Sequence, residues 1–168
     1  MIIIVEGIDR VGKTTLCNKL SEELNIPIYK HSQNFIDYSS MDNTRETEKM
    51  ICMLDICKAA DTNIIFDRFH FSDYVYGIIE RKYDRVLATK NLLMIDSVLA
   101  RMNAIMIIMQ PTDLASSSEQ HGKDLTPYFE LMAKAHAISS TFIYTCDYNH
   151  IDDMVKEVKE LLHEKSSV

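Results

Sequence analysis

Short apolar runs alternate along the chain with longer segments of helical periodicity. The apolar runs have the length of strands, and most are almost continuously hydrophobic, as in strands buried on both faces of a sheet. The five predicted strands cover residues 2–5, 27–29, 63–66, 104–109 and 141–144. The pattern between them predicts helices over residues 13–24, 44–60, 72–81, 86–101, 127–139 and 152–163. This alternation indicates an α/β fold, in which helices cover a parallel sheet.

Two polar stretches interrupt the pattern, at residues 31–43 and 112–126, and they predict surface loops. Neither has a clear period, and the second contains the run SSSEQHGKD. Polar loops of this length in a compact domain are often functional, for example as lids over a binding site. We therefore keep both as candidate parts of a site.

Length and charge narrow the class of protein. With 168 residues, of which 46% are apolar, the chain can bury one sizeable core, so we predict a single domain over residues 1–168. The net charge of −7 argues against nucleic-acid and membrane partners, which attract basic proteins. No apolar run reaches the length of a membrane span, and the first strand is followed at once by Glu6 instead of a signal-peptide core. We therefore expect a cytoplasmic protein that binds small molecules.

The segment GIDRVGKT, from Gly7 to Thr14, lies directly between the first predicted strand and the first predicted helix. It matches the P-loop pattern G-x-x-x-x-G-K-[ST] at every fixed position. Its glycines let successive N–H groups turn inward around a polyphosphate, and the next helix directs its positive end to the same anion. Lys13 supplies a charge for the β- and γ-phosphates, and the Thr14 hydroxyl is suited to bind Mg²⁺.

This loop predicts ATP as the phosphoryl donor and Mg²⁺ as the cofactor. The residues predicted to bind ATP are Gly7, Ile8, Asp9, Arg10, Val11, Gly12, Lys13, Thr14 and Thr15. Asp67 and Arg68 end another buried strand, and ligands of open parallel sheets bind at that edge. We therefore expect Asp67 near the metal with Thr14, and Arg68 near the transferred or accepting phosphate.

Two blocks in this order, VEGIDRVGKTT from Val5 and DRFHFSDYVYG from Asp67, resemble the thymidylate kinase family. That family has an E-G-x-D-x-x-G-K-[ST]-T loop and a D-R-[YF]-x-x-S motif. The resemblance implies a three-layer P-loop NTPase fold with a five-stranded parallel sheet in the order 2-3-1-4-5. It also implies transfer of the ATP γ-phosphate to a deoxynucleoside monophosphate, dTMP above all, and the homodimer that is usual in this family. The apolar residues of the predicted dimer helix are Leu92, Leu93, Ile95, Val98 and Leu99, which suit a core equally well.

The resemblance also assigns roles to residues. Lys13, Arg10, Arg68 and Asp67 become the catalytic residues, the first two on the transferred phosphate and Arg68 on the acceptor phosphate. Asp9 would contact the 3′-hydroxyl of the acceptor.

Further acceptor residues follow from the same resemblance. Ser72 and Tyr76 would lie near the acceptor's sugar and base. An acceptor-binding segment of about residues 31–60 would add Phe35, Tyr38 and Arg45.

The chain departs from the family in two places. The segment before Asp67 is short and lacks a clear R-E-P motif, for which Arg45 in TRET is the nearest candidate. The predicted lid, about residues 112–126, has no arginine, so His121 and Lys123 are its basic candidates, and Gly122 is either a hinge or a turn. Arg10 in the loop would make a lid arginine unnecessary.

Two other functions remain open at this point. A deoxynucleoside kinase would phosphorylate a 5′-hydroxyl and need a carboxylate base, for which Glu6 is a candidate. A nucleotide-binding module without phosphotransfer would keep the loop alone. A GTPase is disfavoured because the chain has no N-K-x-D motif.

Overall fold

In the computed structural model, five strands form one parallel sheet in the order β2-β3-β1-β4-β5. The strands are β1 (Ile2–Glu6), β2 (Ile28–Lys30), β3 (Ile64–Asp67), β4 (Ile105–Gln110) and β5 (Ile143–Asp147). The structure describes residues 1–30, 43–141 and 143–165, with side chains as far as Leu162. The predicted class and strand order are confirmed.

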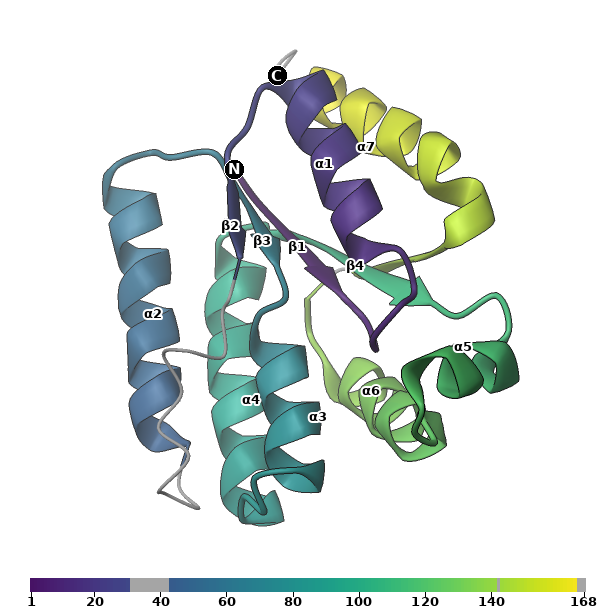
Figure 1. Cartoon of the computed structure of the whole chain (residues 1–168). Coiled ribbons are helices and arrows are strands. Elements are labelled where there is room, and N and C mark those ends of the chain that lie inside the picture. Colours follow the sequence, from purple (N-terminus) through teal and green to yellow (C-terminus); the bar gives the residue numbers. More distant parts are fainter. Residues whose placement is uncertain (31–42, 142, 166–168) are drawn as a thin grey trace.

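Helices cover both faces of this sheet (Figure 1). On one face lie α1 (Lys13–Leu24) and α7 (Ile151–Lys165), packed against each other. The helices on the other side are α2 (Thr44–Ala59), α3 (His70–Ile79), α4 (Arg85–Arg101) and α6 (Thr126–Ile138). The three-layer arrangement expected from the sequence is therefore present.

The core lies in and against the central strands. Ile3, Ile4 and Val5 of β1 have no exposed surface, because strands pair on both sides of β1 and helices cover both its faces. Leu16 and Leu20 of α1 are equally buried. The β-branched residues of β1 favour a strand and gain the hydrophobic free energy of full burial.

Two sequence expectations need correction. Residues 112–126 are not simply a loop, because Leu114–His121 form helix α5. None of its residues is buried, so the helix has no core-facing stripe to produce a period in the sequence. The last strand, predicted at 141–144, is Ile143–Asp147 instead. It is an edge strand with a mixed sequence, IYTCD, and it lacks the continuous apolar run of a central strand.

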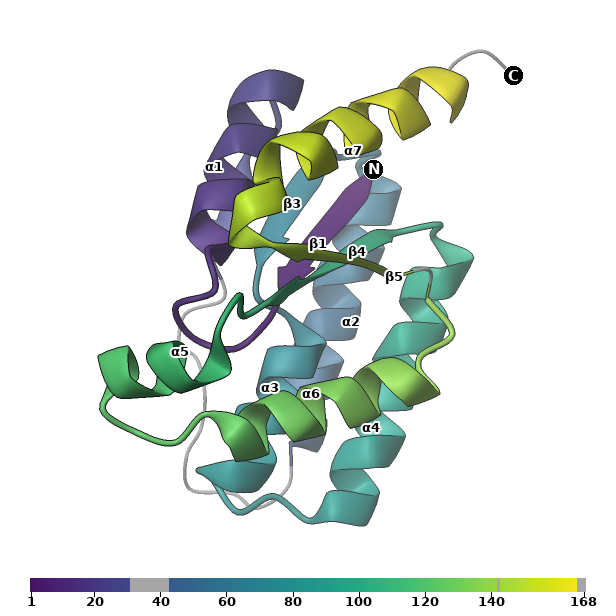
Figure 2. The same ribbon diagram turned by 90° about the vertical axis from the view of Figure 1, so that its right-hand side faces the viewer.

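The carboxyl ends of the strands meet at one edge of the sheet. The loop after β1, residues Asp67 and Arg68 at the end of β3, and the 3-10 helix η2 (Tyr148–His150) after β5 all lie there. Helix α5 lies beside the loop after β1 in two perpendicular views (Figures 1 and 2). Among the described residues, no helix has both the length and the hydrophobicity that a membrane crossing needs.

Candidate active site

Two glycines shape the loop between β1 and α1. Gly7 has φ of 140°, and a Cβ there would lie 2.5 Å from the Met109 carbonyl oxygen of β4. Gly12 has φ of 93°, and a Cβ there would lie 2.7 Å from the ring of Tyr148. Both positions therefore require glycine for the backbone conformation and for space, which lets the loop close against β4 and η2.

A cavity of about 360 Å³ opens beside this loop. Its lining residues are Arg10, Gly12, Lys13, Thr14, Thr15, Asp67, Arg68 and Tyr148. All of them except Tyr148 were predicted from the sequence. The fold thus brings the P-loop and the Asp67-Arg68 pair, more than 50 residues apart in sequence, around one space.

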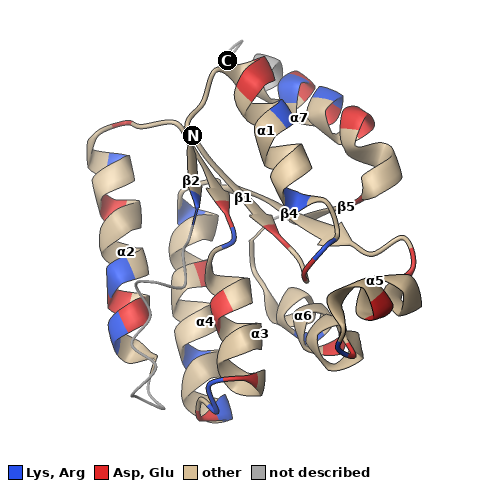
Figure 3. Ribbon diagram, in the orientation of Figure 1, with Lys and Arg blue, Asp and Glu red and all other residues tan. Residues whose placement is uncertain are grey.

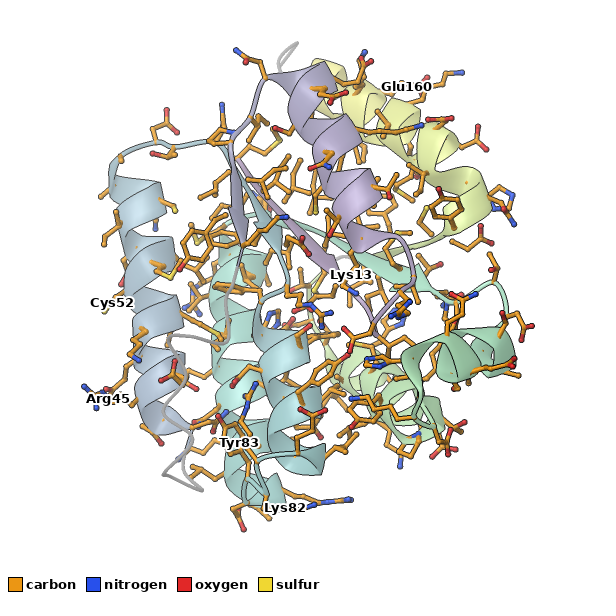
Figure 4. All side chains as sticks on the ribbon, in the orientation of Figure 1. Lys13, Arg45, Cys52, Lys82, Tyr83 and Glu160 are labelled. Carbon is orange, nitrogen blue, oxygen red and sulfur yellow. The ribbon has the colours of Figure 1, made fainter. Side chains whose placement is uncertain are left out.

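Lys13 is buried at the start of α1 (Figure 4), with only 5% of its surface exposed. Its Nζ donates a hydrogen bond to the carbonyl oxygen of Ile8 within the same loop. Burial and the positive charge of Arg68 lower the pKa of Lys13 to about 7, although Asp9 and Asp67 act in the opposite direction. A bound polyphosphate would add negative charge beside this ammonium and favour its charged form.

Thr14 and Asp67 meet across the cavity, where the Thr14 hydroxyl donates to Asp67 Oδ2 at 3.1 Å. This pair fits Mg²⁺, which prefers oxygen ligands and takes one or two from the protein beside phosphate and water oxygens. The predicted metal residues are therefore neighbours, and both line the cavity of the P-loop.

Asp9 joins three parts of the site through one carboxylate. The Arg68 guanidinium donates to its Oδ1, and His121 Nε2 from the end of α5 lies 2.7 Å from its Oδ2. Burial raises the pKa of Asp9, but the charge of Arg68 and the hydrogen bonds from His121 and Arg68 outweigh burial and hold it well below the ordinary range. Asp9 therefore stays ionised. Figure 3 shows acidic and basic positions side by side in this loop.

An aromatic cluster adjoins this carboxylate. The Arg68 guanidinium lies 5.3 Å from the ring centre of Tyr76, and the rings of Tyr76 and Tyr128 are 5.1 Å apart. Lys123 Nζ lies 4.3 Å from the ring centre of Tyr128 and donates to Glu80 Oε1 at 2.8 Å. Burial raises the pKa of Tyr76 to about 12, although the charge of Arg68 and a hydrogen bond with Arg68 act in the opposite direction.

Of three other predicted acceptor residues, one lies apart from the cavity and two are not among the residues that the structure describes. The exposed side chain of Arg45 points away from the site on the outer side of α2 (Figure 4). Phe35 and Tyr38 lie outside the described residues. Their acceptor roles stay predictions.

Ser72 is tied to Glu6. The Ser72 hydroxyl donates to Glu6 Oε2, and Glu6 Oε1 accepts the backbone N–H groups of Phe69 and Phe71 at 2.9 Å and that of Ser72 at 3.2 Å. Glu6 has no exposed surface. Its carboxylate therefore serves the first turn of α3, which leaves it unsuited to act as a catalytic base.

Sequence reasoning gave no role to the side chains of Tyr148, Tyr128 or Glu80. It named His121 and Lys123 as basic lid residues for the phosphates, whereas they contact Asp9 and Glu80. No local pattern marks these contacts, because they depend on how α5 and α6 pack against the P-loop and α3.

The comparisons with known proteins bear on the fold. No protein-family model matches the chain. The SPβ prophage-derived protein YorR of Bacillus subtilis is 26% identical over 166 residues, which cover 94% of this chain and 96% of YorR. A crystal structure of YorR in complex with phosphorylated GDP has a TM-score of 0.79 at 24% identity and covers 100% of this chain and 99% of that one.

Kinase structures are similar over nearly the whole chain. Thymidylate kinase from Candida albicans has a TM-score of 0.59 at 16% identity, covering 98% of this chain and 92% of that one. Deoxyadenosine kinase from M. mycoides with bound dATP has a TM-score of 0.53 at 18% identity, covering 97% and 100%. The fold is that of the P-loop kinases.

Proposed function

We propose that this chain is an ATP-dependent nucleoside monophosphate kinase, with dTMP as the first acceptor to test. The observation that carries the proposal is the cavity that Lys13 of the P-loop and Arg68 line together. Two anions meet in phosphoryl transfer, so the site needs cations on both sides of the transferred group. Lys13 and Arg10 supply them on the donor side, and Arg68 supplies one on the acceptor side.

The step needs no covalent nucleophile from the protein. An oxygen of the acceptor phosphate forms a new P–O bond to the γ-phosphorus of ATP, while the bond from that phosphorus to the β–γ bridging oxygen breaks. The products are ADP and a nucleoside diphosphate. Lys13 and Arg10 offset the charge on the transferred group, and Arg68 orients the attacking phosphate.

Thr14 and Asp67 are the residues that would hold Mg²⁺. When bound, the ion neutralises charge on the donor phosphates. Asp9, kept ionised by Arg68 and His121, is suited to accept a hydrogen bond from a sugar hydroxyl of the acceptor. Tyr76 adds a buried hydroxyl beside this carboxylate and Arg68. These features support the acceptor role that the resemblance gives Asp9 and Tyr76.

A specific observation disfavours the deoxynucleoside kinase alternative. Its candidate base, Glu6, is fully buried and accepts hydrogen bonds from the start of α3. A carboxylate in that position cannot reach a nucleoside 5′-hydroxyl without breaking this cap.

A guanine nucleotide is the second candidate ligand. The similar protein YorR was crystallised in complex with phosphorylated GDP. dGMP and GMP therefore belong in the acceptor panel, and GTP belongs in the donor panel.

The test is a product assay with purified protein, Mg²⁺ and ATP or GTP. The acceptors are dTMP, dGMP, dCMP, dAMP, GMP and the corresponding nucleosides, and the products are separated by chromatography. We expect a nucleoside diphosphate from at least one monophosphate and no product from nucleosides. Phosphorylation of a nucleoside, or of no acceptor at all, would overturn the proposal.

The variant Arg68→Ala tests the acceptor clamp. Removing the guanidinium leaves the acceptor phosphate without its cation, so we expect transfer to fall by a factor on the order of 10³, while calorimetry still detects Mg-ATP binding. The control is Arg101→Ala, which removes an exposed arginine from the far end of α4. Turnover in Arg68→Ala equal to that of the control would reject this role.

A further inference from the structure

The end of α5 is attached to the P-loop through His121. This residue is the last of the helix, and its Nε2 lies 2.7 Å from Asp9 Oδ2. About a quarter of each of the two side chains is exposed, at 26% and 23%, so water screens the contact only in part. The contact joins positions 112 residues apart, and Arg68 already holds the other oxygen of the same carboxylate.

Local structure defines the place of the His121 ring. Gly122 follows with φ of 71°, and its N–H donates a hydrogen bond to the carbonyl oxygen of Glu119, so α5 ends at His121. A helix end carries partial negative charge and favours a donor or a cation there. Lys123 then contacts Tyr128 and Glu80, which attaches the segment after α5 to α6 and α3 as well. The backbone around His121 is thus fixed by α5 before it and by the contacts of Lys123 after it.

The segment from Asp113 to Lys123 directs its uncharged and its basic side chains to different places. A smaller cavity of about 140 Å³ adjoins Arg10 and Tyr148, and α5 contributes the uncharged Ser116, Ser117 and Gln120 to its lining, beside the acidic cap residue Asp113. The basic residues of the segment, His121 and Lys123, contact Asp9 and Glu80 instead. The segment therefore directs its basic groups to the side of the proposed acceptor.

We propose that His121 is a positioning residue for acceptor binding. By donating to Oδ2, it orients the Asp9 carboxylate, with Arg68 on Oδ1, to receive a sugar hydroxyl of the nucleoside monophosphate. The inference rests on the proposed function and deepens it, because it makes α5 a determinant of acceptor affinity and not of ATP binding. A contact that only stabilised the fold would change neither the affinity for the acceptor nor the affinity for ATP.

The test compares the Michaelis constants of two variants with those of the parent, using the best acceptor of the panel. In His121→Ala the carboxylate loses one donor, and we expect the KM for the acceptor to rise about tenfold while the KM for ATP stays within about twofold. In His121→Gln the side-chain N–H can donate at nearly the same place, so most of the affinity should return. Glu119→Gln, an exposed change two residues earlier in α5, is the matched control.

Three outcomes would overturn the inference. They are an unchanged acceptor KM in His121→Ala, a rise in the KM for ATP instead, and a His121→Gln variant as impaired as His121→Ala. Circular dichroism of each variant checks that the fold is intact.

Calorimetric binding of the same monophosphate separates this inference from the proposed function. A parent that binds the monophosphate without phosphorylating it would reject the kinase, and weaker monophosphate binding by His121→Ala at unchanged Mg-ATP affinity would still support the role of His121. A parent that binds no nucleoside monophosphate would overturn both.

Discussion

Lys13 shows how burial sets the chemistry of single residues in this site. The loop places its ammonium against a carbonyl and out of water, and the nearby Arg68 adds positive charge. Its pKa of about 7 lies below the ordinary 10.5, so the empty folded protein binds fewer protons than the unfolded chain between these values. Stability from this group therefore rises with pH through that window. A bound polyphosphate would reverse the shift, because it favours the charged form.

We expect ATP binding to take up a proton at Lys13. At pH 8 the Lys13 side chain is neutral in most ligand-free molecules, and a bound triphosphate favours its protonated form. Uptake should therefore approach roughly one proton per site. At pH 6 the lysine is already charged, so uptake should be small. Calorimetry at each pH in buffers of different ionisation enthalpy measures this number.

Lys13→Met is the control, and it should show weak binding without proton uptake. Equal uptake at pH 6 and pH 8 would contradict the assignment of the proton to Lys13.

At the scale of elements, α3 depends on a carboxylate from β1. Glu6 accepts three backbone N–H groups at the start of α3, in the place that a local capping residue would normally take. Its negative charge also lies at the positive end of the helix dipole. Arg68 directly precedes this turn, so the cap also holds the backbone from which the Arg68 side chain reaches Asp9.

Glu6→Gln should therefore destabilise the protein without removing a catalytic group. An amide is a weaker acceptor than a carboxylate for several donors, and we expect a loss of about 1–3 kcal/mol in the free energy of unfolding. Urea denaturation measures this value. Phosphotransfer should persist in the folded variant.

Full stability combined with abolished transfer would mean that Glu6 acts in the chemistry. Glu22→Gln, at an exposed position of α1, is a control for the loss of one carboxylate.

At the scale of the whole molecule, ligand binding and folding are linked. The cavity is built from the P-loop, the end of β3 and η2, so a ligand that contacts all three stabilises only the folded chain. A concentration of 100 times Kd adds about 2.7 kcal/mol, which corresponds to roughly 5–10 °C in Tm for a chain of this size.

We expect Mg-ATP to raise the Tm by this amount and ATP with EDTA to raise it by less. The difference reports the metal at Thr14 and Asp67, so it should vanish in Asp67→Asn. Thermal scans followed by circular dichroism measure these shifts. An equal shift with and without Mg²⁺ in the parent protein would contradict the metal site.

The homodimer stays a prediction. Leu92, Ile95 and Leu99 of α4 are buried within the chain, whereas Leu93 is 42% exposed. The apolar stripe read from the sequence thus serves mainly the core, because α4 packs against α2 and α3.

Much of the fold and most of the cavity lining follow from the sequence alone. The central strands are continuous apolar runs, and the P-loop is a set of adjacent residues whose backbone conformation depends on two glycines nearby. Such features are local, so they can be recognised in the sequence without knowledge of distant contacts. The surface helix α5 and the edge strand β5 were less predictable, because neither buries a regular face.

The sequence by itself determined the glycine-containing loop from Gly7 to Thr14, the parallel sheet and the Asp67-Arg68 pair at its edge. Only the tertiary structure decided the partners of these residues: Thr14 for Asp67, the first turn of α3 for Glu6, and both Arg68 and His121 for Asp9. The reason is physical. Local conformation depends on neighbouring residues, whereas these contacts join positions from 53 to 112 residues apart and exist only because helices pack on the sheet.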